Sequence, residues 1–269
     1  MSGTKARRVT ASLAAGALLF VLAWTGDAAA ATRKPSVASK PVSQFFEAGG
    51  VKLRYLVDGI GEPVVLLHGL HATAYESWQK TGLLSAVAKA GHRAIALDLP
   101  GHGESDKPDI AEAYGKAMVE DVRLLLDHLG IAKAHIVGHS LGALVAMKFV
   151  ALHPDRVLTA AIGAMGWMRD SKWLQGIWER LPVREAGNTS RTCIRSIEQL
   201  EISKAELESI KAPTAVILGD KDPVRRMYIS PLKYVRKDWP VIVIEGGGQA
   251  TVLDKKQFRD ELLKWLKRN

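Results

Sequence analysis

The chain contains a single cysteine, Cys193, in 269 residues. One thiol cannot form an intramolecular disulfide, so a disulfide-stapled fold is excluded. An isolated cysteine most often packs as a small hydrophobic residue, and we interpret Cys193 in that way; a reactive thiol is the alternative.

Histidine is scarce as well: there are eight, and none follows His153. No histidine pair has the spacing of a zinc motif together with matching carboxylates, so the sequence predicts no metal site and no cofactor. The composition is otherwise ordinary for a folded domain, with 47% hydrophobic and 24% charged residues.

Residues 1–30 differ in kind from the rest. A basic stretch from Lys5 to Arg8 precedes an apolar run over 11–24, and Ala28 to Ala30 offers a small-residue cleavage site. A membrane anchor is the alternative, but the run is short for a bilayer. We therefore predict a cleaved signal peptide over 1–30, no stable membrane anchor after cleavage, and export to the periplasm or the extracellular space.

The excess of positive charge is spread along the chain. Residues 1–30 hold three basic residues and one acidic residue, so their removal lowers the net charge from +9 to +7. No basic stripe is interleaved with aromatic residues, the pattern that favours binding of single-stranded nucleic acid. We expect a solvated basic surface and no nucleic-acid partner.

Residues 31–43 are polar, with two prolines and no hydrophobic period, and are predicted to form a flexible leader. From 44 to 269, strand-like and helix-like segments alternate, and we expect one domain. The expected strands are Gln44–Glu47, Val51–Val57, Val64–Leu67, Ala94–Leu97, His135–Val137, Val157–Ile162, Ala215–Leu218 and Val241–Ile244. The expected helices are Ser77–Ala90, Glu112–Leu129, Leu141–Leu152, Tyr228–Arg236 and Gln257–Lys267.

This alternation predicts an α/β fold with a mostly parallel central sheet flanked by helices. In such sheets, functional residues gather beyond the carboxyl ends of the strands. Residues 167–211 interrupt the alternation and are predicted to form a small helical cap inserted between the sixth and seventh strands. Its residues Trp167, Trp173 and Trp178 either line an apolar pocket or pack the cap against the sheet.

Ser140 lies in Gly138-His139-Ser140-Leu141-Gly142. This G-x-S-x-G pattern at a strand-to-helix junction is typical of a nucleophile elbow, whose partners follow in the order Ser, Asp or Glu, His. A serine that merely caps the following helix is the alternative.

Four motifs occur in an order that resembles the α/β-hydrolase fold family, over about residues 44–269. They are Pro63–Gly69 (PVVLLHG), Asp98–Pro108 (DLPGHGESDKP), the elbow Gly138–Gly142, and Gly219–Pro223 (GDKDP). The resemblance implies a serine hydrolase acting on esters or related acyl compounds, with Ser140 as nucleophile. It also implies that the backbone N–H groups of Leu70 and Leu141 form an oxyanion hole, and that Asp222 is the acid. For Asp222, a turn-stabilising aspartate is the alternative reading.

Gln249 stands where this family has its catalytic histidine, in the turn after Val241–Ile244. A glutamine amide cannot take up a proton near neutral pH, so the general base that activates the serine is missing. Of the histidines expected at the same rim, His68, His102 and His139 are predicted to have structural or lining roles. His71 is the candidate for an alternative base.

Two functions remain open. The first is an exported hydrolase whose activity is impaired at Gln249 or rescued by His71. The second is a non-catalytic protein that binds a small ligand on a hydrolase scaffold. In either case the expected partner is a small apolar ester or acyl-type molecule. A lyase or a cofactor-independent oxygenase on the same fold is a third possibility. The missing histidine does not favour it, because lyases and oxygenases of this fold generally use the histidine as well.

Overall fold

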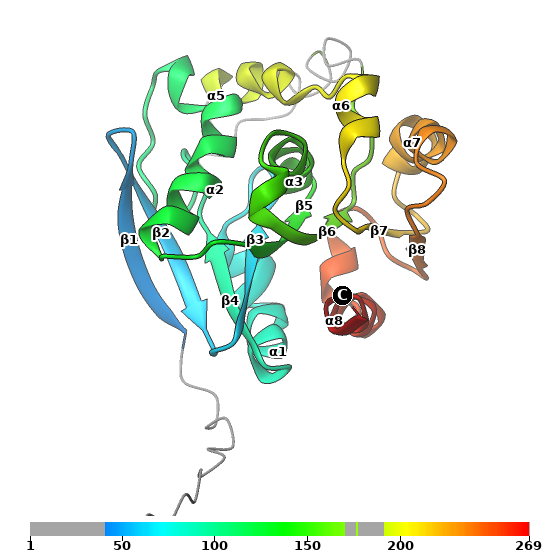
Figure 1. Cartoon of the computed structure of the whole chain (residues 1–269), viewed down its shortest axis with the longest axis horizontal. Coiled ribbons are helices and arrows are strands. Elements are labelled where there is room, and N and C mark those ends of the chain that lie inside the picture. Colours follow the sequence, from blue (N-terminus) through cyan, green and yellow to red (C-terminus); the bar gives the residue numbers. More distant parts are fainter. Residues whose placement is uncertain (1–40, 170–175, 177–190, 269) are drawn as a thin grey trace, which may run out of the picture. The chain divides into compact units, whose positions relative to one another are not determined.

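The computed structural model describes residues 41–169, residue 176 and residues 191–268. Their centre is an eight-stranded sheet in the order β1-β2-β4-β3-β5-β6-β7-β8 (Figure 1). The strands are β1 (Val42–Ala48), β2 (Val51–Asp58), β3 (Glu62–Leu67), β4 (His92–Leu97), β5 (Ala134–His139), β6 (Val157–Gly163), β7 (Thr214–Gly219) and β8 (Val241–Ile244). The first two strands are antiparallel to their neighbours, and all pairs from β4 to β8 are parallel. The predicted mostly parallel sheet is confirmed.

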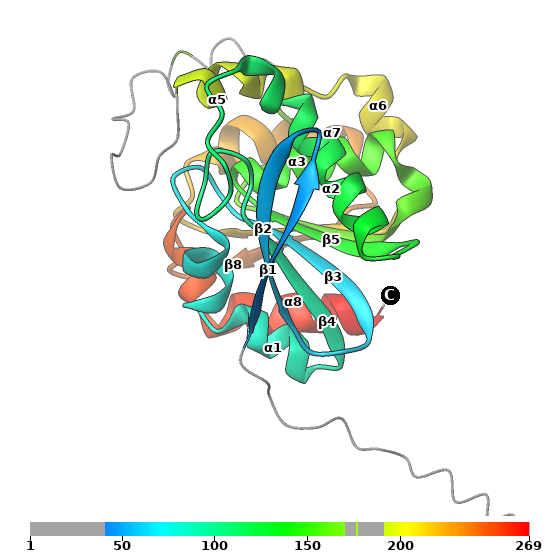
Figure 2. The same ribbon diagram turned by 90° about the vertical axis from the view of Figure 1, so that its left-hand side faces the viewer.

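Every residue of β5 and of β7 is buried, which explains why their sequences are nearly continuous apolar runs. Helices α2 (Lys116–His128), α3 (Leu141–Leu152) and α7 (Ser230–Val235) pack on one face of the sheet. Helices α1 (Leu83–Lys89) and α8 (Lys256–Arg268) pack on the other (Figures 1 and 2).

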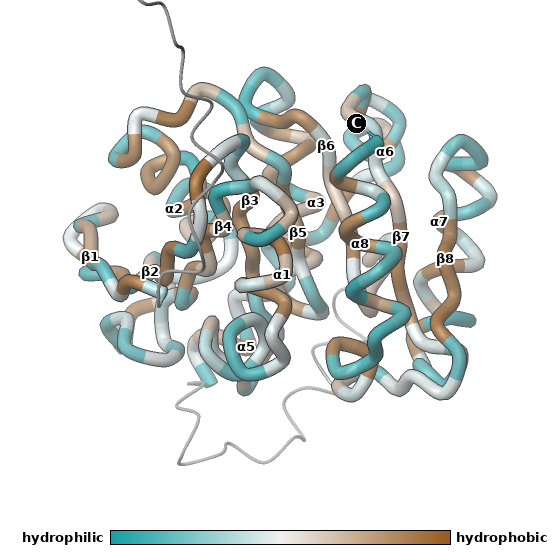
Figure 3. The backbone as a smooth tube through the Cα atoms, turned by 90° about the horizontal axis from the view of Figure 1, so that it is seen from below, coloured by the Kyte–Doolittle hydropathy of each residue, from teal (hydrophilic) through white to brown (hydrophobic). Residues whose placement is uncertain are grey.

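Helix α8 shows how one face is selected for burial. Its buried side chains are Phe258, Leu262 and Leu266, which recur every fourth residue and form one apolar stripe. The remaining positions are mostly hydrophilic (Figure 3). In the part of the chain that the structure describes, no helix is long and apolar enough to cross a membrane.

A hairpin joins the first two strands: Ala48 pairs with Val51 across a two-residue turn. Gly49 and Gly50 adopt φ values of 57° and 85°, the left-handed region that a tight turn of this kind requires. The first strand begins at Val42 rather than at Gln44, because Val42 and Ser43 pair with β2. The predicted leader is therefore two residues too long at its end. Residues 1–40, with the predicted signal peptide and most of the leader, lie outside the described residues.

Two predicted helices are shorter or broken in the structure. The segment Ser77–Ala90 is interrupted at Gly82, whose φ of 76° separates a short π-helical turn, Tyr75–Gln79, from α1. The segment Glu112–Leu129 becomes helical only at Lys116, after Gly115 with φ of 61°. In both cases a glycine with positive φ, a conformation in which other residues would be strained, directly precedes the first residue of the α-helix.

Between β6 and β7 lie α5 (Arg191–Ser196), a short 3-10 turn (Ile197–Leu200) and α6 (Lys204–Ser209). The N-terminus of α6 carries a reciprocal capping box between Ser203 and Glu206. Trp167 is buried and its indole N–H donates to the carbonyl of Ile202 at 2.7 Å, so this tryptophan packs rather than lines an open pocket. Trp173 and Trp178 lie outside the described residues, and a cap over 167–211 stays a prediction.

Candidate active site

Ser140 occupies a sharp turn between the end of β5 and the start of α3. Its backbone has φ of 53° and ψ of −112°, a strained conformation of the kind that clusters at functional sites. The flanking glycines are required by space: a Cβ on Gly138 would lie 2.1 Å from the carbonyl oxygen of Gly142. A Cβ on Gly142 would lie 2.2 Å from the carbonyl oxygen of Leu67. The serine makes no side-chain capping bond to α3, so the helix-cap alternative is not supported.

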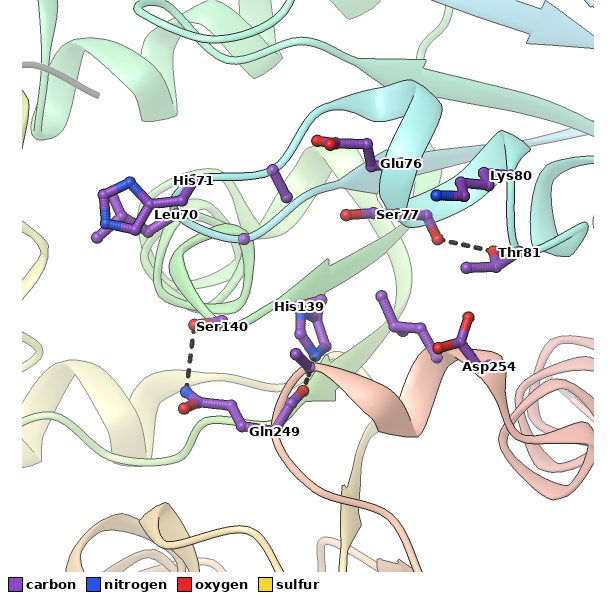
Figure 4. A pocket seen from close by; sticks show the side chains of 14 residues that line it. Leu70, His71, Glu76, Ser77, Lys80, Thr81, His139, Ser140, Gln249 and Asp254 are labelled. Carbon is purple, nitrogen blue, oxygen red and sulfur yellow. Dashed lines mark hydrogen bonds between the residues drawn. The ribbon is translucent and has the colours of Figure 1, made fainter. Parts of the chain in front are cut away.

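The hydroxyl of Ser140 faces a pocket of about 540 Å³ (Figure 4). Its lining comes from the loop after β3, the short helix that follows, the elbow, and the turn after β8. The lining residues are Gly69, Leu70, His71, Ala72, Glu76, Ser77, Lys80, Thr81, His139, Ser140, Gln249, Ala250, Leu253 and Asp254. The predicted rim is therefore the place where most of the predicted site residues meet.

Gln249 lies beside the serine, as the motif order predicts. Its Nε2 group donates a hydrogen bond to Ser140 Oγ over 3.4 Å (Figure 4). The amide thus contacts the hydroxyl with a donor, where an activating base would contact it with an acceptor.

His139 holds this turn in place. Its Nε2–H donates to the backbone carbonyl oxygen of Gln249 at 2.8 Å. Burial lowers the pKa of His139 to about 4, so the ring is neutral near pH 7. Because the proton on Nε2 points at a carbonyl, this nitrogen cannot accept a proton from Ser140. The predicted lining role of His139 fits this geometry.

Asp222 is 3% exposed and follows β7. Its Oδ1 accepts the N–H of Val224 at 3.0 Å, the contact expected of a turn-stabilising aspartate. Its Oδ2, in contrast, is buried and has no hydrogen-bond partner among the described residues. Burial raises the pKa of this carboxyl to about 6. A buried acceptor without a donor is uncommon, and in a triad this oxygen would receive the histidine N–H.

The turn that bears Asp222 is joined to the turn that bears Gln249. Backbone N–H groups of Asp220 and Lys221 donate to the carbonyls of Ile244 and Gly247, both at 3.0 Å. A Cβ on Gly219 would lie 1.9 Å from the oxygen of Gly247, so the two turns touch through their backbones. The structure thus brings the turn that carries Asp222 next to the turn that carries Gln249, where the family's histidine is expected.

The two predicted oxyanion donors have suitable backbone groups. Leu141 is the first residue of α3, where an N–H has no partner within the helix. Within the described residues, neither its N–H nor that of Leu70 donates a hydrogen bond. The side chain of Leu141 is buried in the core, whereas Leu70 lines the pocket.

The remaining rim histidines separate into two groups. His68 is fully engaged, since its Nε2 accepts the N–H of Leu99 at 3.0 Å and its Nδ1 donates to the carbonyl of Gly69. His102 lies 3.0 Å from the carbonyl of Pro100 through Nδ1, and burial lowers its pKa to about 3. Both positions match the predicted structural role. His71 lines the pocket with φ of 60°, on the other side of Ser140 from Gln249 in the view of Figure 4.

One buried carboxylate that the sequence reasoning missed ties two rim loops together. Asp98 Oδ1 accepts the N–H of Ala74 at 2.7 Å, and Oδ2 accepts from Arg54 Nη1 at 3.1 Å. Asp98 directly follows a buried strand run, a position that could have marked it as a rim residue. The pocket wall formed by Glu76, Lys80 and Asp254 had no comparable signal, because it depends on how two distant turns approach each other.

Comparison with known proteins agrees with this architecture. Residues 62–165 match the model of the alpha/beta hydrolase fold family. The chain is 40% identical over 145 residues to the dihydrolipoyllysine-residue acetyltransferase component of the acetoin cleaving system of Pseudomonas putida, covering 52% of this chain and 38% of the relative. It is 45% identical over 100 residues to epoxide hydrolase B of Mycobacterium tuberculosis, covering 37% and 27%. These matches span less than half of either relative's own length.

A solved carboxylesterase of Nitrososphaera gargenis superposes with a TM-score of 0.72 at 20% identity, covering 84% of this chain and 98% of that one. At this identity the likeness shows the fold alone. Together with the family match over residues 62–165 and the sheet order, it shows that the chain has the α/β-hydrolase fold.

Proposed function

We propose that this protein is a serine hydrolase scaffold for small ester or acyl compounds whose turnover is blocked at Gln249. The observation that carries the proposal is the contact of the Gln249 amide with Ser140 Oγ, in a pocket that is also lined by the predicted oxyanion donor Leu70. Relatives named for epoxide hydrolysis and acetyl transfer support small-molecule chemistry at this site. Of these two kinds of chemistry, a serine hydroxyl at the elbow favours acyl transfer, because a serine can form an ester with the acyl group and release it again.

The reaction requires a proton acceptor at position 249. Ser140 Oγ would attack the carbonyl carbon, and the hydroxyl proton would have to move to a neighbouring base as the new C–O bond forms. The N–H groups of Leu70 and Leu141 would stabilise the oxyanion, and Asp222 Oδ2 would hold a base in position. Glutamine cannot accept the proton, and its N–H occupies a lone pair of the nucleophile.

The pocket mixes apolar and charged walls. Leu70 and Leu253 lie on the same cavity as the charged Glu76, Lys80 and Asp254. We therefore narrow the expected substrate to a small acyl compound with a polar or charged end, a change from the purely apolar ligand that the sequence favours.

The test is Gln249→His, assayed with short-chain p-nitrophenyl esters against the unaltered protein. In a known serine protease, losing the histidine costs about 10⁶ in kcat, so restoring an imidazole beside Ser140 and Asp222 is expected to raise kcat/KM by several orders of magnitude. Gln249→Asn, which changes the side chain without adding a base, is the matched control and should stay inactive. Adding Ser140→Ala to Gln249→His should abolish the gained activity.

Two outcomes would overturn the proposal. If the unaltered protein already turns over esters quickly and His71→Ala stops it, Gln249 does not block the site. If Gln249→His folds normally, stays inert and still binds small apolar ligands tightly, the protein is a binding module instead. The hydrogen bond from the Gln249 amide to the Ser140 hydroxyl is the observation that favours this second function.

A further inference from the structure

A second cluster of side chains lies at the other edge of the sheet, where the parallel strands begin. One ligand-type atom from each of Glu62, His92 and His135 lies within 4.8 Å of the other two. Glu62 and His92 open β3 and β4, whereas Ser140 follows the far end of β5. Six residues of strand separate the two edges by roughly 16 Å, so this cluster is independent of the pocket and of its proposed function.

Strand register explains why three residues distant in sequence meet here. Glu62 pairs with His92, and Val64 pairs with His135. Paired residues on neighbouring strands point to the same face, and Glu62 and Val64 are two residues apart on one strand. All three side chains therefore project from the face that α1 and α8 cover.

His135 is already oriented as a ligand would be. Its Nε2 lies 3.0 Å from Glu62 Oε2, and its Nδ1 lies 2.7 Å from the hydroxyl of Thr159. A histidine that binds a metal through one nitrogen typically donates the N–H of the other to such an outer partner, which fixes the ring. The imidazole itself is buried.

His92 supplies a buried ring nitrogen that the contacts of the fold do not account for. Its Nδ1 is buried and has no hydrogen-bond partner among the described residues, and its ring meets that of His135 edge-on at 5.7 Å between centroids.

We propose that Glu62, His92 and His135 form a binding site for a divalent transition-metal ion, with zinc as the best match. Two imidazoles and one carboxylate are a common zinc donor set, and exposure of Glu62 leaves a fourth position open to water. Ligand atoms at the usual zinc distances lie about 3.4 Å apart, so closing the cluster needs a shift of about 1.4 Å at most, within reach of the exposed glutamate. The ion would fasten the starts of β3, β4 and β5 to one another.

The experiment measures zinc binding to the full chain, with any purification tag removed, by competition with a chromogenic chelator. One zinc per chain is expected, together with a rise in Tm that depends on zinc concentration. His92→Ala should abolish stoichiometric binding. Thr159→Val, which removes only the outer partner, should weaken binding about 10- to 100-fold.

Glu62→Gln keeps the side-chain shape at an exposed position, so it folds normally and should weaken zinc binding at least about tenfold. Glu120→Gln is the matched control, because Glu120 pairs with His153 at 2.8 Å and no third ligand has been found there among the described residues. The site is refuted if the unaltered chain binds no stoichiometric zinc. It is equally refuted if His92→Ala and Glu62→Gln leave binding unchanged, or if Glu120→Gln weakens it as much as Glu62→Gln.

Discussion

The buried Oδ2 of Asp222 predicts a measurable dependence of stability on pH. The pKa of this carboxyl is raised from 3.8 to about 6 in the folded protein by burial. Folding therefore favours the protonated form, and the contribution of Asp222 to stability is fully present below pH 3.8. It is lost as the pH rises toward 6, because the folded chain must then carry a buried charge without a partner.

The size of this effect follows from the shift. The rise of the pKa from 3.8 to about 6 corresponds to a loss of about 3 kcal/mol of folding stability over the full titration. About 2 kcal/mol of this loss falls between about pH 4.5 and 7. Replacement by asparagine removes the titration but keeps the acceptor for the Val224 N–H. We expect the free energy of unfolding of the native protein to fall by about 2 kcal/mol relative to Asp222→Asn across that range.

Urea unfolding at several pH values, with both proteins measured side by side, checks this prediction. All other titrating groups are shared and cancel in the difference. In the Gln249→His background, the new imidazole N–H is expected to bond Oδ2, lower the pKa of Asp222 and flatten the dependence. A difference between native protein and Asp222→Asn that does not change with pH would refute the reasoning, since it would mean that the carboxylate has found a donor.

Two further predictions concern what holds the rim loops and the segment after β6. Arg54→Met should lower the free energy of unfolding by about 3 kcal/mol, because it leaves the buried Asp98 without its cation. Glu104→Gln removes only the second, exposed ion pair of Arg54 and should cost under about 1 kcal/mol. Equal effects in urea unfolding would contradict a buried role for Asp98. Ser203→Ala should cost about 1 kcal/mol by removing the cap of α6, visible as a lower urea midpoint; no change would mean that this helix adds nothing to global stability.

Much of the fold was predictable because burial on both faces leaves a direct trace in the sequence. The runs Val157–Ile162 and Val241–Ile244 match β6 and β8 within a residue, and Leu141–Leu152 matches α3 at both ends. Helix starts at Leu83 and Lys116 were not predicted, since each depends on a single glycine adopting a left-handed conformation.

The site was predictable where a motif carries its own geometry. The small neighbours of Ser140 and the spacing from Gly219 to Asp222 are local, and each could be identified from a few residues. The bond from His139 to the Gln249 carbonyl joins positions 110 residues apart, and the pocket wall from Glu76 to Thr81 meets Asp254 only in three dimensions. Neither has a local pattern, so both required the structure.

The pairing of the two turns after β7 and β8 bears on how such a protein can evolve. Residue 249 is positioned mainly through backbone atoms: its own carbonyl bonded to His139, and the nearby carbonyls of Ile244 and Gly247 bonded to the acid-bearing turn. The side chain at 249 can therefore be exchanged at little cost to folding. Glutamine and histidine codons differ by one base, so under the proposed function a silent and a reactive form of this fold are one substitution apart, and that substitution leaves the backbone contacts of the turn in place.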